Sequence, residues 1–348
     1  KTASNLQLYG DSTAVLRSDT GLIHLDLDAG NSTDIQLGSR PSDGLLLPDG
    51  RLLVLADDLQ GNFAFTILGD VITPIDLLSN ASGETDALES MVGWASVAVD
   101  ASGDGVLVPR SPDDSPVELR QLTVGDDITS SATAVMVAPG TTAVGGGLTT
   151  TLIAQPTDGG LALSLWSNST ATLISPEPVT IPGVASILGY SDDTGLVFAW
   201  VPGGEGESSE IKVLDADANF ATLQTIGELD ELVAVDTQRS VIFSLSSSSP
   251  ILRAIDAVTS ATLARWELLS PLSTFDDPTE IAIAPGGNEL VILVAGGIAT
   301  LALTTIDAHR VRTDGSTAVY PLRFAARVIG DNAVPRFQSV PRFVATQG

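Results

Sequence analysis

The sequence predicts an all-β protein, a β-propeller of seven blades with about four antiparallel strands in each blade. Short runs rich in Val, Ile, Leu, Thr and Ala recur between clusters of Gly, Pro, Asp, Asn and Ser, while helical periodicity is scarce. The runs pair around turn residues at a spacing of roughly 46 residues, a typical size for one blade. Seven such units fill the 348 residues, and a miscounted turn would make the number six or eight.

Seven hairpins are predicted, each made of two apolar runs joined by a turn rich in Gly, Asp, Asn or Ser. In the second hairpin, Leu45–Leu47 and Leu52–Leu55 flank Pro48-Asp49-Gly50, whose glycine suits the positive φ of a tight turn. In chain order the predicted hairpins cover residues 6–16, 45–55, 97–108, 152–165, 187–199, 232–245 and 281–293.

Stacking of blades explains how a chain of this length forms one domain. A small twisted sheet cannot bury both faces alone, so neighbouring sheets pack against each other and share a core. We therefore expect residues 1–322 to form one propeller without an internal linker. Residues 323–348 are expected to form a basic C-terminal extension.

Two segments resemble the repeat of bacterial YVTN and lactonase-type propellers, in which a strand, a turn similar to Pro-Asp-Gly and a second strand open each blade. They are residues 41–55 and 278–293, with Pro285-Gly286-Gly287-Asn288 at the turn of the latter. A later strand of that repeat often ends in Ile-Asp-x-x-Thr, and Ile255–Thr259 and Val213–Asp215 are similar to it. The resemblance extends over nearly the whole chain and implies the propeller architecture, although the Tyr-Val-Thr-Asn tetrad itself does not occur.

Charge and composition exclude several classes of function. The chain has 16 Lys and Arg against 43 Asp and Glu, a formal charge of −27, so it lacks the cationic footprint that nucleic acid requires. It contains no Cys, which excludes disulfides, thiolate nucleophiles and Cys-ligated metals. No apolar run is long enough for a transmembrane helix. The start at Lys1 resembles a mature end left after processing, so we expect an exported protein, periplasmic or at the cell surface.

Several motifs suggest chemistry, but each has a structural explanation. Gly10-Asp11-Ser12 resembles the nucleophile block of Gly-Asp-Ser hydrolases, yet a blade turn is the simpler explanation, and Asp307 and His309 are spaced one residue too closely for the usual partner pair. Asp100–Gly105 matches the front half of a calcium loop, but Ser111 stands where the loop needs Glu. His24 and His309 are the only histidines. We therefore predict no cofactor, no metal and no catalytic residue.

Two further patterns have simple explanations. Sequons occur at Asn31, Asn80 and Asn168, and such triplets arise by chance in a chain rich in Ser and Thr. Gly145-Gly146-Gly147 lacks the Lys-Ser/Thr that would make it a phosphate loop.

The C-terminal segment contrasts with the acidic body. Residues 309–348 contain six arginines and two aspartates, and Val-Pro-Arg-Phe occurs twice, at 334–337 and 340–343. Proline favours an extended backbone, while Arg and Phe are effective interface anchors. The predicted partner-binding residues are Arg323, Arg327, Pro335, Arg336, Phe337, Pro341, Arg342 and Phe343. An equally simple alternative is that the segment closes the ring by adding a strand to the first blade, with its arginines over the protein's own acidic surface, and a third possibility is that it is disordered.

These patterns together favour a non-catalytic binding or scaffold protein. We expect it to recognise a protein partner or a neighbouring subunit through blade loops and the C-terminal segment, because propeller loops vary over a rigid framework. The alternative is a lactonase-like or other hydrolase that uses the central funnel.

Overall fold

The computed structural model describes most of the chain between residues 4 and 303 and two short strands after it. The described residues are 4–8, 13–18, 21–26, 31–37, 40–57, 62–68, 71–75, 77, 93–111, 114–175, 177–204, 208–246, 251–267, 278–283, 289–294, 297–303, 318–319 and 323–326. Throughout these ranges the regular structure is β-strand. None of the described residues belongs to a helix long and apolar enough to cross a membrane.

The described strands form seven separate sheets, of which the first four cover residues 4–182. The first contains β1 (Ser4–Leu8), β2 (Thr13–Ser18), β3 (Gly21–Asp26) and β4 (Asn31–Gln36). The second contains β5 (Arg40–Leu46), β6 (Leu52–Asp57), β7 (Asn62–Leu68) and β8 (Val71–Ile75). The third contains β9 (Gly93–Val99), β10 (Asp104–Arg110), β11 (Val117–Val124) and β12 (Ile128–Val137). The fourth contains β13 (Thr142–Gly145), β14 (Thr150–Thr157), β15 (Gly160–Ser167), β16 (Thr172–Leu173) and β17 (Val179–Pro182).

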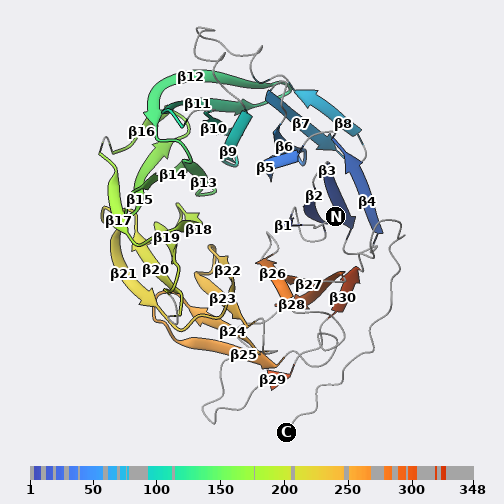
Figure 1. Cartoon of the computed structure of the whole chain (residues 1–348), viewed down its shortest axis with the longest axis vertical. Helices are drawn as coiled ribbons and strands as arrows, with labels where there is room; N and C mark the ends of the chain where they lie inside the picture. Colours follow the sequence, from blue (N-terminus) through green and yellow to red (C-terminus); the bar gives the residue numbers. More distant parts are fainter. Residues whose placement is uncertain are drawn as a thin grey trace. The chain divides into compact units, whose positions relative to one another are not determined.

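The remaining three sheets have the same plan, with strands side by side in chain order (Figure 1). The fifth contains β18 (Ser186–Ser191), β19 (Leu196–Val201), β20 (Glu210–Asp215) and β21 (Ala221–Ile226). The sixth contains β22 (Leu232–Asp236), β23 (Val241–Leu245), β24 (Ile251–Asp256), β25 (Thr262–Glu267) and β29 (Ala318–Val319), the last paired in parallel with β25. The seventh contains β26 (Pro278–Ile283), β27 (Glu289–Val294), β28 (Gly297–Ala302) and β30 (Arg323–Ala326).

All seven predicted hairpins are found as antiparallel strand pairs, but one has a different place in its sheet. Six of them are the first two strands of a sheet, whereas residues 152–165 lie in β14 and β15, the second and third strands. The first strand, β13, is only four residues long and was not predicted. Measured from the β13–β14 turn around Gly147, the distance to the matching turns on either side is about 45 residues, so the blade period is more regular than the sequence suggested.

A recurring aspartate turn marks the later strands. In Asp215, Asp236 and Asp256, one carboxylate oxygen accepts hydrogen bonds from the backbone N–H groups two and three residues further on. The fifth residue of each turn has a left-handed backbone, with φ of 56° at Asn219, 53° at Ser240 and 55° at Ser260. The aspartate side chain thus accepts the hydrogen bonds of backbone N–H groups in the turn, which would otherwise have to be donated to water.

The chain forms two compact units: residues 37–202 with 214–222, and residues 1–36, 203–213 and 223–348. In the first unit, apolar side chains of neighbouring sheets form three clusters, for example Leu53, Leu107 and Leu122 between the second and third sheets. In the second unit, Phe243, Leu252 and Ile292 belong to one cluster between the sixth and seventh sheets. Each fully buried Leu or Phe contributes about 1.5–3 kcal/mol relative to exposure, so face-to-face packing of sheets holds each unit together.

Candidate binding site

The predicted partner-binding segment is described only at its start. Arg323 begins β30, which pairs with β28, and the register places Arg323 opposite Thr300. The other predicted residues, Arg327, Pro335, Arg336, Phe337, Pro341, Arg342 and Phe343, lie outside the described residues. The boundary predicted after residue 322 and the role of this segment therefore stay predictions.

Asp100 forms a turn whose oxygens are occupied by protein donors. Its Oδ1 accepts hydrogen bonds from the N–H of Ser102 at 2.9 Å, the N–H of Asp104 at 3.1 Å and Ser102 Oγ at 2.6 Å. Its Oδ2 accepts a bond from Asn168 Nδ2 at 3.2 Å. These hydrogen bonds are those of an Asx turn, which accounts for the Asp and Gly spacing of this segment without a bound cation. Within the described ranges, no three His or acidic side chains gather as metal ligands.

Two residues singled out by the sequence have structural positions. Asn168 is 1% exposed, and its Oδ1 accepts a hydrogen bond from Thr151 Oγ1 at 2.9 Å, so a glycan cannot be attached there without breaking this cluster. His24 lies in β3, opposite Val15 and Thr33 on the adjacent strands. Residues 9–12 and 307–309, which the hydrolase alternative would use, lie outside the described residues.

The run Gly145–Gly147 does lead into an anion site, and the anion is the protein's own Asp192. The carboxylate of Asp192 accepts hydrogen bonds from three successive N–H groups: Leu148 at 3.0 Å, Thr149 at 2.7 Å and Thr150 at 3.0 Å. Successive N–H groups pointing at one acceptor form an anion-binding nest. A Cβ on Gly146 would lie 2.6 Å from a Tyr190 ring carbon and 2.8 Å from Asp192, so only glycine fits this close approach.

Tyr190, on β18, completes this junction between the fourth and fifth sheets. We call it the Asp192 nest (residues 146–150, Tyr190 and Asp192). The Tyr190 hydroxyl and Thr150 Oγ1 are 2.8 Å apart, and Thr150 Oγ1 also donates to Asp192 at 3.3 Å. Burial raises the pKa of Tyr190, and the nearby Asp192 and Asp217 carboxylates act in the same direction, while the hydrogen bond with Thr150 opposes them. The nest joins the fourth and fifth sheets and is a structural device, not an open site.

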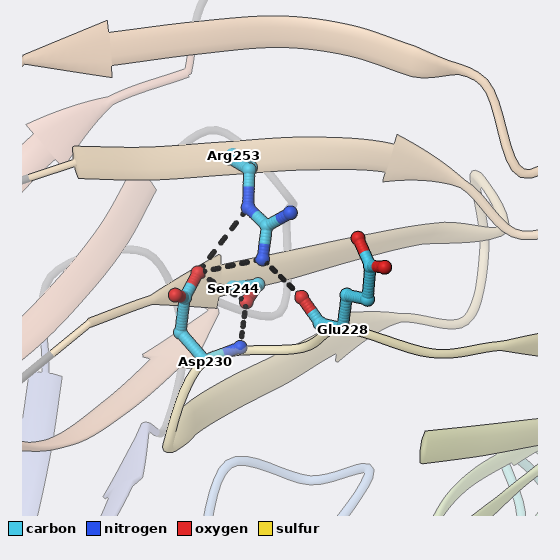
Figure 2. Close-up of polar contacts among 4 residues, drawn as sticks. All are labelled: Glu228, Asp230, Ser244 and Arg253. Carbon is cyan, nitrogen blue, oxygen red and sulfur yellow. Dashed lines mark hydrogen bonds and ion pairs between the residues drawn. The ribbon is translucent and has the colours of Figure 1, made fainter. Parts of the chain in front are cut away.

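An open site is found in the sixth sheet, where a loop aspartate fixes an arginine (Figure 2). Asp230 precedes β22, Ser244 lies on β23 and Arg253 on β24. Asp230 Oδ2 accepts hydrogen bonds from Arg253 Nε at 3.2 Å and Nη2 at 2.8 Å and from Ser244 Oγ at 2.9 Å. Ser244 Oγ in turn accepts a hydrogen bond from the Asp230 N–H at 2.8 Å, so the carboxylate is held by its own backbone as well.

The backbone beside Asp230 is shaped by the same arginine. Arg253 Nη2 donates a 2.6 Å hydrogen bond to the carbonyl oxygen of Glu228, whose φ is 54°. A left-handed glutamate costs free energy and persists only where neighbouring contacts determine it. Figure 2 shows the guanidinium between Asp230 and Glu228, each on the loop before β22.

A second arginine, Arg265 on β25, lies directly opposite Arg253 on β24. In the register of β24 and β25, Arg253 is opposite Arg265, so their side chains share one face of the sheet. Like charges directly opposite each other destabilise a sheet. Asp230 forms an ion pair with Arg253, whereas the exposed Arg265 has no ion-pair partner in the part of the chain that the structure describes.

These residues line an open cleft of about 530 Å³, which we call the arginine cleft; its walls are Glu228, Asp230, Ser246, Ile251, Arg253, Thr262 and Arg265. The volume lies within the usual range for a ligand site. The sequence did not single out these residues, because the cluster depends on strand register. The available signal was the presence of two of the sixteen cations near the centres of adjacent short strands.

Comparison with known proteins identifies the architecture. No family model matches the chain, and no curated protein matches it. Among solved structures, hydrazine synthase from Kuenenia stuttgartiensis is similar with a TM-score of 0.58 at 10% identity, covering 86% of this chain and 95% of that chain. The Dos1 propeller has a TM-score of 0.49 at 12% identity, covering 86% of this chain and 82% of that one.

Such low identity carries information about the fold alone. The similarity to hydrazine synthase covers most of both chains, and the described residues form successive sheets of mostly four antiparallel strands. The chain is therefore an all-β protein with the β-propeller fold.

Proposed function

We propose that this chain is a non-catalytic binding or scaffold propeller of an exported protein assembly. In this proposal seven blades of the YVTN or lactonase-like type form the framework, and a protein partner or neighbouring subunit is recognised by blade loops and by residues 323–348. The assembly is periplasmic, extracellular or at the cell surface.

The arginine cleft is the observation that carries this proposal. It lies beside the loop that leads into β22, and it presents an exposed cation next to one that the fold has already fixed in place. Loops on a rigid sheet are where propellers, like other closed β folds, place recognition. The carboxylates of Asp100 and Asp192, by contrast, accept hydrogen bonds from backbone N–H groups of the protein and stabilise its turns.

The C-terminal segment supplies the second part of the proposal and its test. Deleting residues 333–348 is expected to abolish assembly in native gel filtration of the complex from the source organism, while the melting temperature of the isolated chain stays unchanged. In a matched variant, Arg336, Phe337, Arg342 and Phe343 are replaced by Ser. It keeps the length of the segment, so it distinguishes the effect of these side chains from the effect of removing the segment.

The opposite pattern contradicts the proposal. If the deletion strongly lowers the melting temperature and leaves assembly intact, the segment stabilises the propeller and does not bind a partner.

A further inference from the structure

We infer that the arginine cleft binds a carboxylate group supplied by an acidic segment of a partner protein, an inference that rests on the proposed function. It rests on the Arg265 cation, which has no ion-pair partner among the described residues, on the fixed guanidinium of Arg253, and on an open cleft that both side chains line. The charge of the cleft, the fixed position of Arg253 and the shape of the cleft each restrict the class of ligand that fits.

Arg265, unpaired within the described part of the chain, is the feature that favours a singly charged anion. Arg253 and Arg265 face the cleft together, and Asp230 is paired with Arg253 at 2.8 Å. Among the described residues, that leaves one cation, Arg265, and one carboxylate, Glu228, to act on a ligand, so the formal charges of the cleft wall cancel. Any anion in the cleft faces the carboxylates of Glu228 and Asp230, and a phosphate, with nearly two negative charges, is repelled more strongly than a carboxylate, which matches the single charge of Arg265.

Preorganisation distinguishes this cleft from an ordinary surface arginine. Arg253 donates three hydrogen bonds to Asp230 and Glu228, through Nε and Nη2, so the ligand need not order this side chain. Within the described residues, Arg253 forms its hydrogen bonds through Nε and Nη2, so Nη1 is left for a second acceptor. A carboxylate between two opposite arginines also relieves their mutual repulsion.

The shape of the site favours a carboxylate that belongs to a longer chain. The cleft is open, and Ile251 and Thr262 provide its uncharged walls. An exposed ion pair alone is weak, so a small free acid gains little affinity from it. A peptide segment can add contacts along the walls, and its backbone and apolar atoms can cover the stem of Arg265.

Glu228 and Arg265 allow a test in which two substitutions should change the binding affinity in opposite directions. Its carboxylate also lines the cleft and repels an anionic ligand, so Glu228→Gln should strengthen binding, whereas Arg265→Gln should weaken it. Side-chain exchange at Glu228 leaves untouched the carbonyl oxygen that accepts the bond from Arg253. Both side chains are exposed, so both variants are expected to melt like the wild type.

The experiment measures fluorescence anisotropy of a short labelled peptide alternating Glu and Gly, with the matched Gln and Gly peptide as control. At about 0.15 M salt the Debye length is about 8 Å, so the distant acidic residues of the chain are largely screened. The full chain should bind the Glu peptide more tightly than the Gln peptide. Arg265→Gln should weaken Glu-peptide binding about threefold to tenfold, and Glu228→Gln should tighten it about twofold.

Equal affinity for the two peptides, or no loss in Arg265→Gln, would overturn the inference. Glutarate, added as a competitor at the same carboxylate concentration, separates the two sources of a carboxylate. If it displaces the peptide efficiently, the cleft takes a free small acid and the assignment to a partner segment is wrong. Because the peptide assay needs no partner, peptide binding can succeed even if the deletion of residues 333–348 shows that the proposed assembly function fails.

Discussion

Asp192 and Asp230 are two loop carboxylates at strand starts or ends, and they act in opposite ways. Asp192 accepts three backbone N–H bonds from Leu148, Thr149 and Thr150 and so closes a junction between two sheets. Asp230 accepts bonds from Arg253 and Ser244 and leaves an open cleft beside a second arginine. Backbone donors from another sheet thus make Asp192 part of the fold's framework, whereas the side-chain partners of Asp230 leave it at the edge of the cleft that we propose as a binding surface.

The largest expected effect comes from removing the structural carboxylate. Asp192→Ala leaves three N–H groups without their charged acceptor, and we expect the free energy of unfolding to fall by about 2–3 kcal/mol. Urea denaturation followed by tryptophan fluorescence measures the loss. Asp192→Asn is the matched control, because it keeps one oxygen acceptor and should lose less. A loss no larger than experimental scatter in Asp192→Ala would remove the structural role of the nest.

A third arginine, Arg120, sharpens the comparison, because it is buried and no carboxylate among the described residues forms an ion pair with it. Arg120 is 3% exposed; its Nε donates to Ser130 Oγ at 3.2 Å, and its Nη2 has no hydrogen-bond partner among the described residues. Burial lowers the pKa of Arg120, a sign that its charged form is disfavoured there, although Glu118 opposes the effect. Ser130 Oγ donates to the Leu77 carbonyl oxygen at 2.7 Å, so its own hydrogen bond does not depend on Arg120.

Arg120→Met is therefore expected to raise the free energy of unfolding by about 1–2 kcal/mol, since an apolar side chain of similar length avoids the desolvation cost. Thermal and urea melts of this variant test the expectation. Arg51→Met is the contrasting variant and should not gain stability. Arg51 is paired with Asp49 and donates a hydrogen bond to the carbonyl oxygen of Gly125 at 2.6 Å, so the substitution removes favourable contacts. A destabilised Arg120→Met would mean that the buried guanidinium has a favourable partner.

The smallest effect concerns the alkaline behaviour of the Asp192 nest. Because burial raises the folded pKa of Tyr190, the unfolded chain loses the proton first as pH rises. This contribution to stability is fully present below the ordinary tyrosine pKa of about 10 and is lost as pH rises through the folded pKa. Comparing the pH dependence of unfolding in wild type and Tyr190→Phe checks it, and identical alkaline slopes would contradict the assignment.

The strand pattern could be predicted from the sequence because it is local. Runs such as Leu45–Leu47 and Leu52–Leu55 around Pro48-Asp49-Gly50 carry their own turn signal, and they form β5 and β6 as predicted. β13 was missed because four residues following a buried Thr141 give no clear alternation, and the stronger hairpin next to it took its place in the predicted repeat.

The two carboxylate clusters could not be predicted in the same way. Asp192 is more than forty residues from the N–H groups that it binds, and Arg253 meets Arg265 only through the register of two strands. Gly145-Gly146-Gly147 lacks the Lys-Ser/Thr of a phosphate loop, and the carboxylate bound after this run comes from another turn of the same chain. Residue type therefore indicated the chemistry, while the partner depended on tertiary structure.

The most direct test of this account is a side-by-side urea denaturation of Asp192→Ala and Arg265→Gln. We expect Asp192→Ala to unfold at clearly lower urea, and Arg265→Gln to unfold at the same urea concentration as the wild type, because only the first carries structural hydrogen bonds. If Arg265→Gln lost as much stability as Asp192→Ala, the arginine cleft would be part of the structural framework, and the division between a structural and a binding carboxylate would be wrong.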